Sequence, residues 1–211
     1  MGQLFIKICG VTTLEDALYA AEQGANAIGF NFYPKSGRFI SVDAAVAIAQ
    51  QLPAEILRIG VFVNPMRESV RSISEMGILN AIQFSGNESP EDVSGYRLPV
   101  LKAIHISNEN SLDVMRSYQV DAFLLDTHRP GYFGGTGKTF DWMIGLKAAG
   151  FGKVILAGGL TPDNVASAVA AVHPYGIDVS SGIEVRPGIK DHKKIRDFIL
   201  RAREAESSIG G

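Results

Sequence analysis

The chain has a single cysteine among its 211 residues, so it forms no internal disulfide, and this usage is compatible with a reducing cytosol. It also lacks any apolar run near the roughly 20 residues that a membrane-spanning helix needs. The N-terminus shows no basic segment followed by an apolar one, so we expect no signal peptide. The formal net charge of −2 gives no electrostatic reason to expect binding to nucleic acid or to an anionic membrane. These absences predict a soluble, cytoplasmic, globular protein.

Hydrophobic residues make up 46% of the chain, enough for a sizeable core, and the chain repeats one plan of strand, short loop and helix. Thr12 and Glu15 have the spacing of a capping box, which predicts a helix after the first strand. A capping residue followed by proline predicts three further helix starts, at Asn64-Pro65, Ser89-Pro90 and Thr161-Pro162.

Eight strands are predicted, at residues 4–8, 25–32, 57–63, 80–84, 100–106, 121–125, 153–157 and 177–179. Eight strands alternating with eight helices in about 200 residues favour a single (βα)8 TIM barrel over residues 1–211, rather than an open sheet with fewer strands. The longest predicted loops, 33–42, 127–139 and 180–190, all follow strands. They would therefore share the face where barrel enzymes place their active sites.

The end of the first strand carries one candidate catalytic residue. Because alternate residues of a barrel strand point inward, we expect Lys7 and Cys9 to face the interior. Cys9 could be a small buried hydrophobe, but a nearby cation lowers the pKa of a thiol, and the thiolate can act as a base. Lys7 needs an anionic partner, since an isolated buried charge is very costly. Asp126 and Asp178, each at the top of a strand, are the candidates.

Asp126 ends the apolar run FLLD. It could be a capping or structural aspartate, but a carboxyl group at the end of a buried strand can have its pKa raised enough for acid catalysis. Asp178 could equally pair with Lys7 or contact a substrate.

Two glycine-rich segments suggest a phosphate site. Gly158 and Gly159 end the seventh strand, and Ser181 and Gly182 follow the eighth. In barrels, the loops after strands seven and eight often bind phosphate through backbone N–H groups. Two tight turns would have the same composition, but their position in the chain favours phosphate binding.

Three other features are less specific. Residues 134–139, GGTGKT, lack the glycine spacing of a nucleotide-binding loop, and we interpret them as a mobile lid. Lys35 and Arg38 are either solvated surface charges or part of a site for an anionic ligand. The four histidines show no metal-ligand spacing, so we expect no metal site.

Five motifs fall in order along the chain: KICG at 7–10, LLDT at 124–127, GGTGKTFDW at 134–142, LAGGL at 156–160 and DVSSGIE at 178–184. Over nearly its whole length the chain therefore resembles phosphoribosylanthranilate isomerase, a barrel enzyme family of tryptophan biosynthesis. The resemblance implies conversion of N-(5-phosphoribosyl)anthranilate to 1-(2-carboxyphenylamino)-1-deoxyribulose 5-phosphate, an Amadori rearrangement that needs no cofactor.

The resemblance also implies roles for individual residues. Asp126 would be the general acid that opens the ribose ring to a Schiff base, and Cys9 the general base that removes the C2′ proton. Arg38 would lie near the anthranilate carboxylate. The implied phosphate loops contain Gly158, Gly159, Ser181 and Gly182, and the other implied substrate-binding residues are Lys7, Gln83 and Asp178.

One departure from the family pattern follows strand four. The family usually reads Gln-Leu-His-Gly there, and this chain reads Gln83-Phe84-Ser85-Gly86, so any contribution of that histidine is absent. Two other functions compete with the family activity. A related sugar isomerase of histidine biosynthesis uses an aspartate at the end of strand one, against which Cys9 argues. A non-catalytic sugar-phosphate-binding barrel would not need both Cys9 and Asp126. The sequence does not decide between a monomer and a homodimer.

Overall fold

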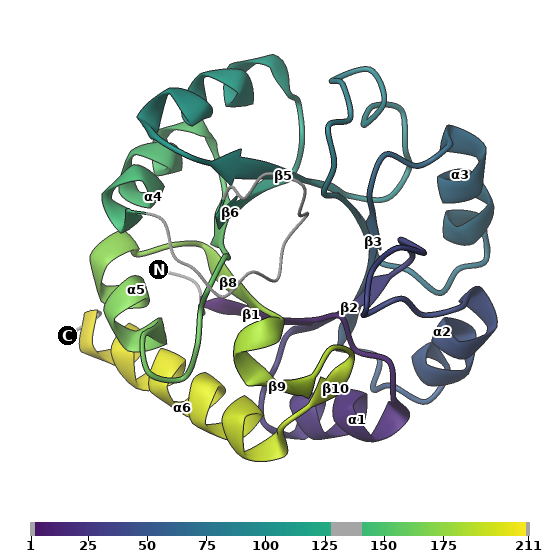
Figure 1. The fold of residues 1–211 in the computed structure, drawn as a ribbon, viewed down its shortest axis with the longest axis horizontal. Helices are drawn as coiled ribbons and strands as arrows, with labels where there is room; N and C mark the ends of the chain where they lie inside the picture. The colour runs from purple at the N-terminus through teal and green to yellow at the C-terminus, as the bar shows by residue number, and fades with distance from the viewer. Residues whose placement is uncertain (1–2, 128–140, 210–211) are drawn as a thin grey trace.

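The computed structural model describes residues 3–127 and 141–209, and its eight central strands form a closed parallel barrel surrounded by helices (Figure 1). The strands follow one another around the barrel in chain order, and the eighth pairs with the first. The predicted TIM barrel is confirmed.

The barrel strands are β1 (Phe5–Cys9), β2 (Ala27–Asn31), β3 (Leu57–Phe62), β4 (Ala81–Phe84), β5 (Val100–Ile106), β6 (Ala122–Thr127), β7 (Val154–Leu156) and β8 (Gly176–Val179). The α-helices are α1 (Leu14–Glu22), α2 (Val42–Ala49), α3 (Arg67–Glu75), α4 (Trp142–Ala148), α5 (Val165–Val172) and α6 (His192–Ile209). Short 3-10 helices are η1 (Glu109–Ser117), η2 (Ala149–Phe151) and η3 (Ser181–Ile183), and a hairpin is formed by β9 (Glu184–Arg186) and β10 (Ile189–Lys190).

Alternation along the strands sorts the buried side chains into two layers. Small and branched residues fill the barrel interior: Ala27, Ile59, Ala81, Leu101, Ala103, Ala122, Leu124, Ile155 and Ala157. The larger cluster lies between barrel and helices and includes Ile6 and Ile8 of β1. Lys7 and Cys9 therefore face the interior, as the alternation predicts.

The segment between β4 and β5 contains only a turn at residues 90–93, so the helix predicted from Ser89-Pro90 is wrong. The backbone N–H and hydroxyl of Ser89 both donate to Asp92, which closes the turn. Glu88 and Lys102 form a buried ion pair beside it (2.9 Å), and the Tyr118 hydroxyl donates to the Glu88 carbonyl (2.7 Å). The eight predicted helices are therefore too many for the described residues, since η1 also replaces an α-helix after β5.

Three predicted helix starts lie close to the observed ones, but the capping residues differ. Helix α1 is capped by Thr13, while the Thr12 hydroxyl donates to the Gly188 carbonyl. Asn64 has a left-handed backbone and accepts from Asn87, so α3 begins three residues later. Helix α5 begins at Val165, after a turn that follows Thr161-Pro162. In each case polar side chains stabilise the loop ahead of the helix, which moves its first turn.

The predicted loop 180–190 contains η3 and the β9–β10 hairpin, which lies beside α1 in Figure 1. Within the described ranges, no helix combines the length and the apolar composition needed to cross a bilayer.

Candidate active site

The interior of β1 carries a buried ion pair with β8. Nζ of Lys7, whose side chain is fully buried, lies 2.7 Å from Oδ1 of Asp178, and the two residues are register partners. Burial opposes the charge on Lys7, but Asp178, with a smaller contribution from Cys9, outweighs it and raises the pKa of Lys7 to about 12. Of the two carboxylates that the sequence offers as partners, Asp178 makes the contact.

Cys9 ends β1 as a buried free thiol, two residues after Lys7. Its register partner on β2 is Gly29, where a β-carbon would stand 2.9 Å from the sulfur, so a larger residue would displace the thiol. Burial raises the pKa of Cys9, and the opposing effects of Lys7 and Lys190 compensate only in part. The expectation that Lys7 gives this thiol a lowered pKa is therefore wrong, because desolvation is the larger effect.

Asp126 lies on the inner face of β6 near its carboxyl end, on the same side as Leu124. Burial, together with the negative charge of Asp178, raises the pKa of Asp126 to about 7. Its Oδ1 accepts a hydrogen bond from the N–H of Thr127 at 2.8 Å. A β-carbon on Gly158 would come within 2.8 Å of the same oxygen, so this position needs glycine both for space and for its φ of 76°. The predicted rise in the pKa of Asp126 agrees with this environment.

One pocket at the carboxyl end of the barrel is lined by most of the predicted site residues: Cys9, Arg38, Gln83, Asp126, Gly158, Gly159, Asp178 and Ser181. Lys7 and Gly182 are not in its lining. Lys7 lies below the pocket and forms an ion pair with Asp178, which does line it. Gly182 packs behind the loop that follows β7. The pocket wall therefore combines a thiol, a carboxyl group of raised pKa and a guanidinium.

The two glycine-rich segments meet at this pocket. Gly158 and Gly159 both have positive φ values, of 76° and 68°. A β-carbon on Gly182 would overlap the carbonyl of Leu160, so the loops after β7 and β8 are in direct backbone contact. The hydroxyl of Ser180 is buried at the same place without a hydrogen-bond partner among the described residues. Backbone N–H groups and this hydroxyl can donate hydrogen bonds to an anion of the size of phosphate.

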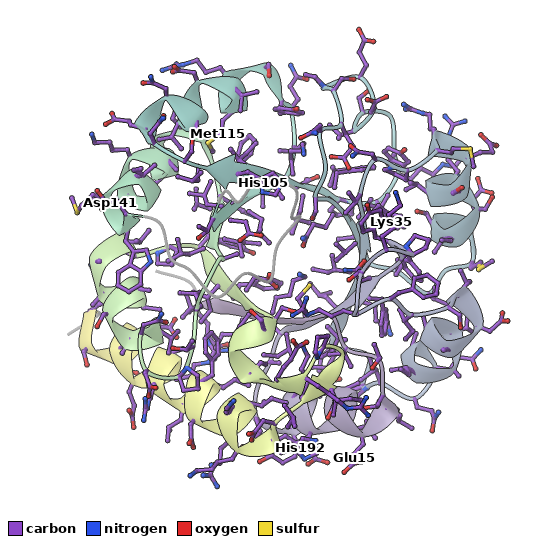
Figure 2. All side chains as sticks on the ribbon, in the orientation of Figure 1. Glu15, Lys35, His105, Met115, Asp141 and His192 are labelled. Carbon is purple, nitrogen blue, oxygen red and sulfur yellow. The ribbon has the colours of Figure 1, made fainter. Side chains whose placement is uncertain are left out.

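Arg38, on the loop after β2, has a side chain only 17% exposed. Lys35 on the same loop, labelled in Figure 2, is exposed and is not part of the pocket lining. The guanidinium makes two parallel hydrogen bonds to Glu184, Nε to Oε1 at 2.9 Å and Nη2 to Oε2 at 2.7 Å. Glu184 in turn bonds Lys190 of β10. The sequence did not lead us to Glu184 and Lys190 as residues that support the site. The feature that could have indicated them is their position in the long loop after β8, which faces the pocket.

Polar side chains meet at the end of β4, where Ser85 follows Gln83 and Phe84. Nε2 of Gln83 donates to the hydroxyl of Ser85 at 3.0 Å, and Oε1 of Gln83 is buried at the pocket without a hydrogen bond in the described structure. His105 of β5 lies with Nε2 3.1 Å from the Ser85 carbonyl (Figure 2). Gln83 therefore presents an acceptor that a substrate hydroxyl can meet.

Two expectations concern other parts of the chain. The predicted lid at residues 134–139 lies outside the described residues. In residues 3–127 and 141–209, no group of three or more His, Cys, Asp or Glu side chains is close enough together to hold a metal ion.

Comparison with known proteins identifies a family of similar sequences. A model of the family N-(5'phosphoribosyl)anthranilate (PRA) isomerase matches residues 6–201. The N-(5'-phosphoribosyl)anthranilate isomerase of Pelobacter propionicus is 47% identical over 96% of this chain and 97% of its own.

Two crystal structures of such isomerases share the fold. One contains monomers generated from the dimeric enzyme of Thermotoga maritima, with a TM-score of 0.86 and 41% identity over 96% of this chain and all of the other. The second is in complex with reduced 1-(o-carboxyphenylamino)-1-deoxyribulose 5-phosphate, with a TM-score of 0.84 and 40% identity over the same shares.

Proposed function

This chain belongs to the N-(5'-phosphoribosyl)anthranilate isomerase family, and we propose that Asp126 and Cys9 are the acid and the base of its reaction. The enzyme isomerises N-(5'-phosphoribosyl)anthranilate in tryptophan biosynthesis. The observation that carries the proposal is that one pocket is lined both by a thiol and by a carboxyl group that holds its proton near neutral pH.

Asp126 acts first, on the ring oxygen of the ribose. With a pKa of about 7, a large share of its carboxyl groups is protonated near neutral pH. Its proton passes to the ring oxygen, the bond from that oxygen to C1′ breaks, and the lone pair of the anilino nitrogen forms the C1′=N bond of a Schiff base. Without the acid, the oxygen would have to leave as an alkoxide.

Cys9 acts second, as a thiolate. It removes the proton from C2′, and the electron pair of that C–H bond forms a C1′=C2′ double bond while the π pair of the C1′=N bond returns to the nitrogen. The resulting enolamine tautomerises to the ketone. Because burial raises the pKa of Cys9, the thiolate is the minor form at neutral pH. The ammonium groups of Lys7 and Lys190 favour that form, and their charges make it accessible.

The remaining pocket residues bind the substrate. The phosphate is bound by the loops that contain Gly158, Gly159, Ser181 and Gly182, since their backbones approach each other without intervening side chains. Arg38 binds the anthranilate carboxylate at the other end, because a guanidinium can meet a carboxylate with parallel hydrogen bonds. Gln83 and Asp178 contact the sugar, and Lys7 holds Asp178 in place.

A single assay tests the acid and base roles. Freshly prepared phosphoribosylanthranilate is added to the wild-type enzyme and to Cys9→Ala and Asp126→Asn, and the loss of anthranilate fluorescence is followed. Each variant should lower kcat by about 10²- to 10⁴-fold, the range typical of removing one acid or base. Both should fold, as circular dichroism would check, since neither change empties a large core volume. Near-normal turnover in a folded variant would remove that residue from the mechanism.

The site takes all of its proposed residues from one chain, so the function is open to a monomer and to a homodimer. The Thermotoga maritima relative is described as dimeric, which supports a homodimer here. We place the enzyme in the cytoplasm, because it belongs to a biosynthetic family and its one cysteine is a free thiol.

A further inference from the structure

A chain of alternating charges runs from the β9–β10 hairpin to the pocket. Nζ of Lys190 lies 2.9 Å from Oε1 of Glu184, whose carboxylate receives both hydrogen bonds from Arg38. The side chains of Lys190, Glu184 and Arg38 are 0%, 5% and 17% exposed, so solvent reaches only the last of them to any extent. Arg38 lines the pocket, whereas Glu184 and Lys190 lie behind it.

Lys190, at the end of this chain of charges that is farthest from the pocket, makes hydrogen bonds to β1, to α1 and to the residue that follows β8. Its ammonium group donates to the carbonyl of Cys9 at 2.5 Å and to that of Ser180 at 3.4 Å. Its backbone N–H donates to Oδ2 of Asp16 on α1 at 3.0 Å. Glu184 is therefore anchored to the ends of β1 and β8, next to the proposed base and the proposed phosphate loops.

The three charged groups do not balance. Burial alone would raise the pKa of Glu184, but hydrogen bonds from Arg38 and the charge of Lys190 outweigh it and hold that pKa below its usual range. One carboxylate thus faces two cations, which leaves one unit of positive charge, and its pocket end is Arg38. Glu184 engages Nε and Nη2 of Arg38, so Nη1 is the guanidinium nitrogen that Glu184 leaves for another acceptor. A carboxylate on the substrate would complete the alternation of charge.

From this geometry we propose that Glu184, anchored by Lys190, is a positioning residue that fixes the Arg38 guanidinium for the carboxylate of the substrate. The proposal rests on the role assigned to Arg38 above. It identifies the specificity-determining unit as the pair Arg38–Glu184 rather than Arg38 alone. A flexible arginine could swing to the sugar phosphate instead, but one clamped by two hydrogen bonds stays at the aromatic end.

The experiment is a double-mutant cycle with two readouts. KM and kcat for phosphoribosylanthranilate are measured for Arg38→Met, Glu184→Gln and the double variant, together with inhibition by ribulose 5-phosphate, a sugar phosphate without the aromatic acid. Glu184→Gln should raise KM by at least about tenfold, as expected when one partner of a buried charged pair is lost, with a smaller effect on kcat. It should add little in the Arg38→Met background, because it acts through Arg38. Inhibition by ribulose 5-phosphate should be unchanged.

A conservative variant and a matched control complete the design. Glu184→Asp keeps the charge and should recover part of the lost affinity, and it replaces Glu184→Gln in the cycle if that protein does not fold. Glu88→Gln also removes the carboxylate of a buried ion pair with lysine, but outside the pocket lining, so it should lower the melting temperature without the rise in KM.

Three results would overturn the proposal: multiplicative KM effects in the cycle, a normal KM for Glu184→Gln, or an equal KM rise in Glu88→Gln. If Arg38→Met itself leaves KM unchanged, the role proposed for Arg38 fails as well. The two failures are therefore distinguishable.

Discussion

Lys7 and Asp178 form an ion pair inside the barrel that joins β1 to β8 directly below the pocket. Lys7→Met should lower the free energy of unfolding by about 3–5 kcal/mol at pH 8, because removing one partner leaves the other charge buried and unpaired. Urea unfolding monitored by circular dichroism measures this. The double variant Lys7→Met/Asp178→Asn should be more stable than Lys7→Met alone. If both proteins unfold at the same urea concentration, the unpaired charge is not the cause.

The pH dependence of kcat/KM follows from the two shifted pKa values. The reactive form has a protonated Asp126 and an ionised Cys9, yet Cys9 has the higher pKa, so only a minor fraction of the enzyme is in this form. The profile should be bell-shaped, with its acidic limb near the pKa of about 7 of Asp126 and its maximum above that pH. Rates with phosphoribosylanthranilate between pH 5 and 10 provide the measurement. A maximum below pH 6 would contradict the assignment.

Ionisation of Asp126 should lower the free energy of unfolding as the pH rises. Its folded-state pKa of about 7 lies above the ordinary carboxyl value of 3.8, so between these values the folded state binds more protons than the unfolded state. The stability contributed by the protonated group is complete below about pH 4 and is lost as the pH passes through 7. Asp126→Asn, which does not ionise, should therefore be more stable than wild type at pH 8, and the difference should shrink toward pH 4. Thermal unfolding at several pH values measures it; a constant difference would rule out the ionisation of Asp126 as its cause.

The positions of Cys9 and Asp126 could be predicted from the sequence because they depend on local patterns. Alternation along a strand fixes which side chains face the barrel, and the strand order brings the carboxyl ends together. The sign of the pKa shift at Cys9 could not be predicted in this way. It depends on how closely the whole barrel excludes water from the thiol, and this burial outweighs the charge of Lys7.

The contacts that surround the pocket depend on residues far apart in the chain. Arg38 and Glu184 are 146 residues apart, and nothing in the local sequence of either one indicates the pairing. The missing helix before β5 has a similar cause, since Glu88 in that segment pairs with Lys102 on β5. Ser89 has the composition of a helix cap, but here it closes that turn with Asp92.

Gly29 should be needed for the position of the thiol. In Gly29→Ala, the new methyl group would stand 2.9 Å from the sulfur of Cys9 and 3.1 Å from Cε of Lys7, so the thiol must move. We expect kcat to fall by about 10- to 100-fold with little change in KM, because a small displacement of a reacting group lowers the rate by this much. Gly150→Ala is the matched control, because a β-carbon there meets nothing within 4 Å. Equal kinetics in the two variants would show that the thiol tolerates the displacement or does not react.

Gly182 should be needed for phosphate binding, because it keeps the loops after β7 and β8 in contact. A β-carbon at this position would overlap the Leu160 carbonyl, so Gly182→Ala must push the two backbones apart and disturb the N–H groups proposed to surround the phosphate. KM for phosphoribosylanthranilate and the inhibition constant of ribulose 5-phosphate should rise together, each by at least about tenfold, since charge-assisted hydrogen bonds to the anion are lost. Val185→Ala changes an exposed residue three positions further on and should alter neither constant. Arg38→Met should raise only the first. If Gly182→Ala raises KM while ribulose 5-phosphate inhibits normally, the phosphate is bound elsewhere and the glycine serves only the fold.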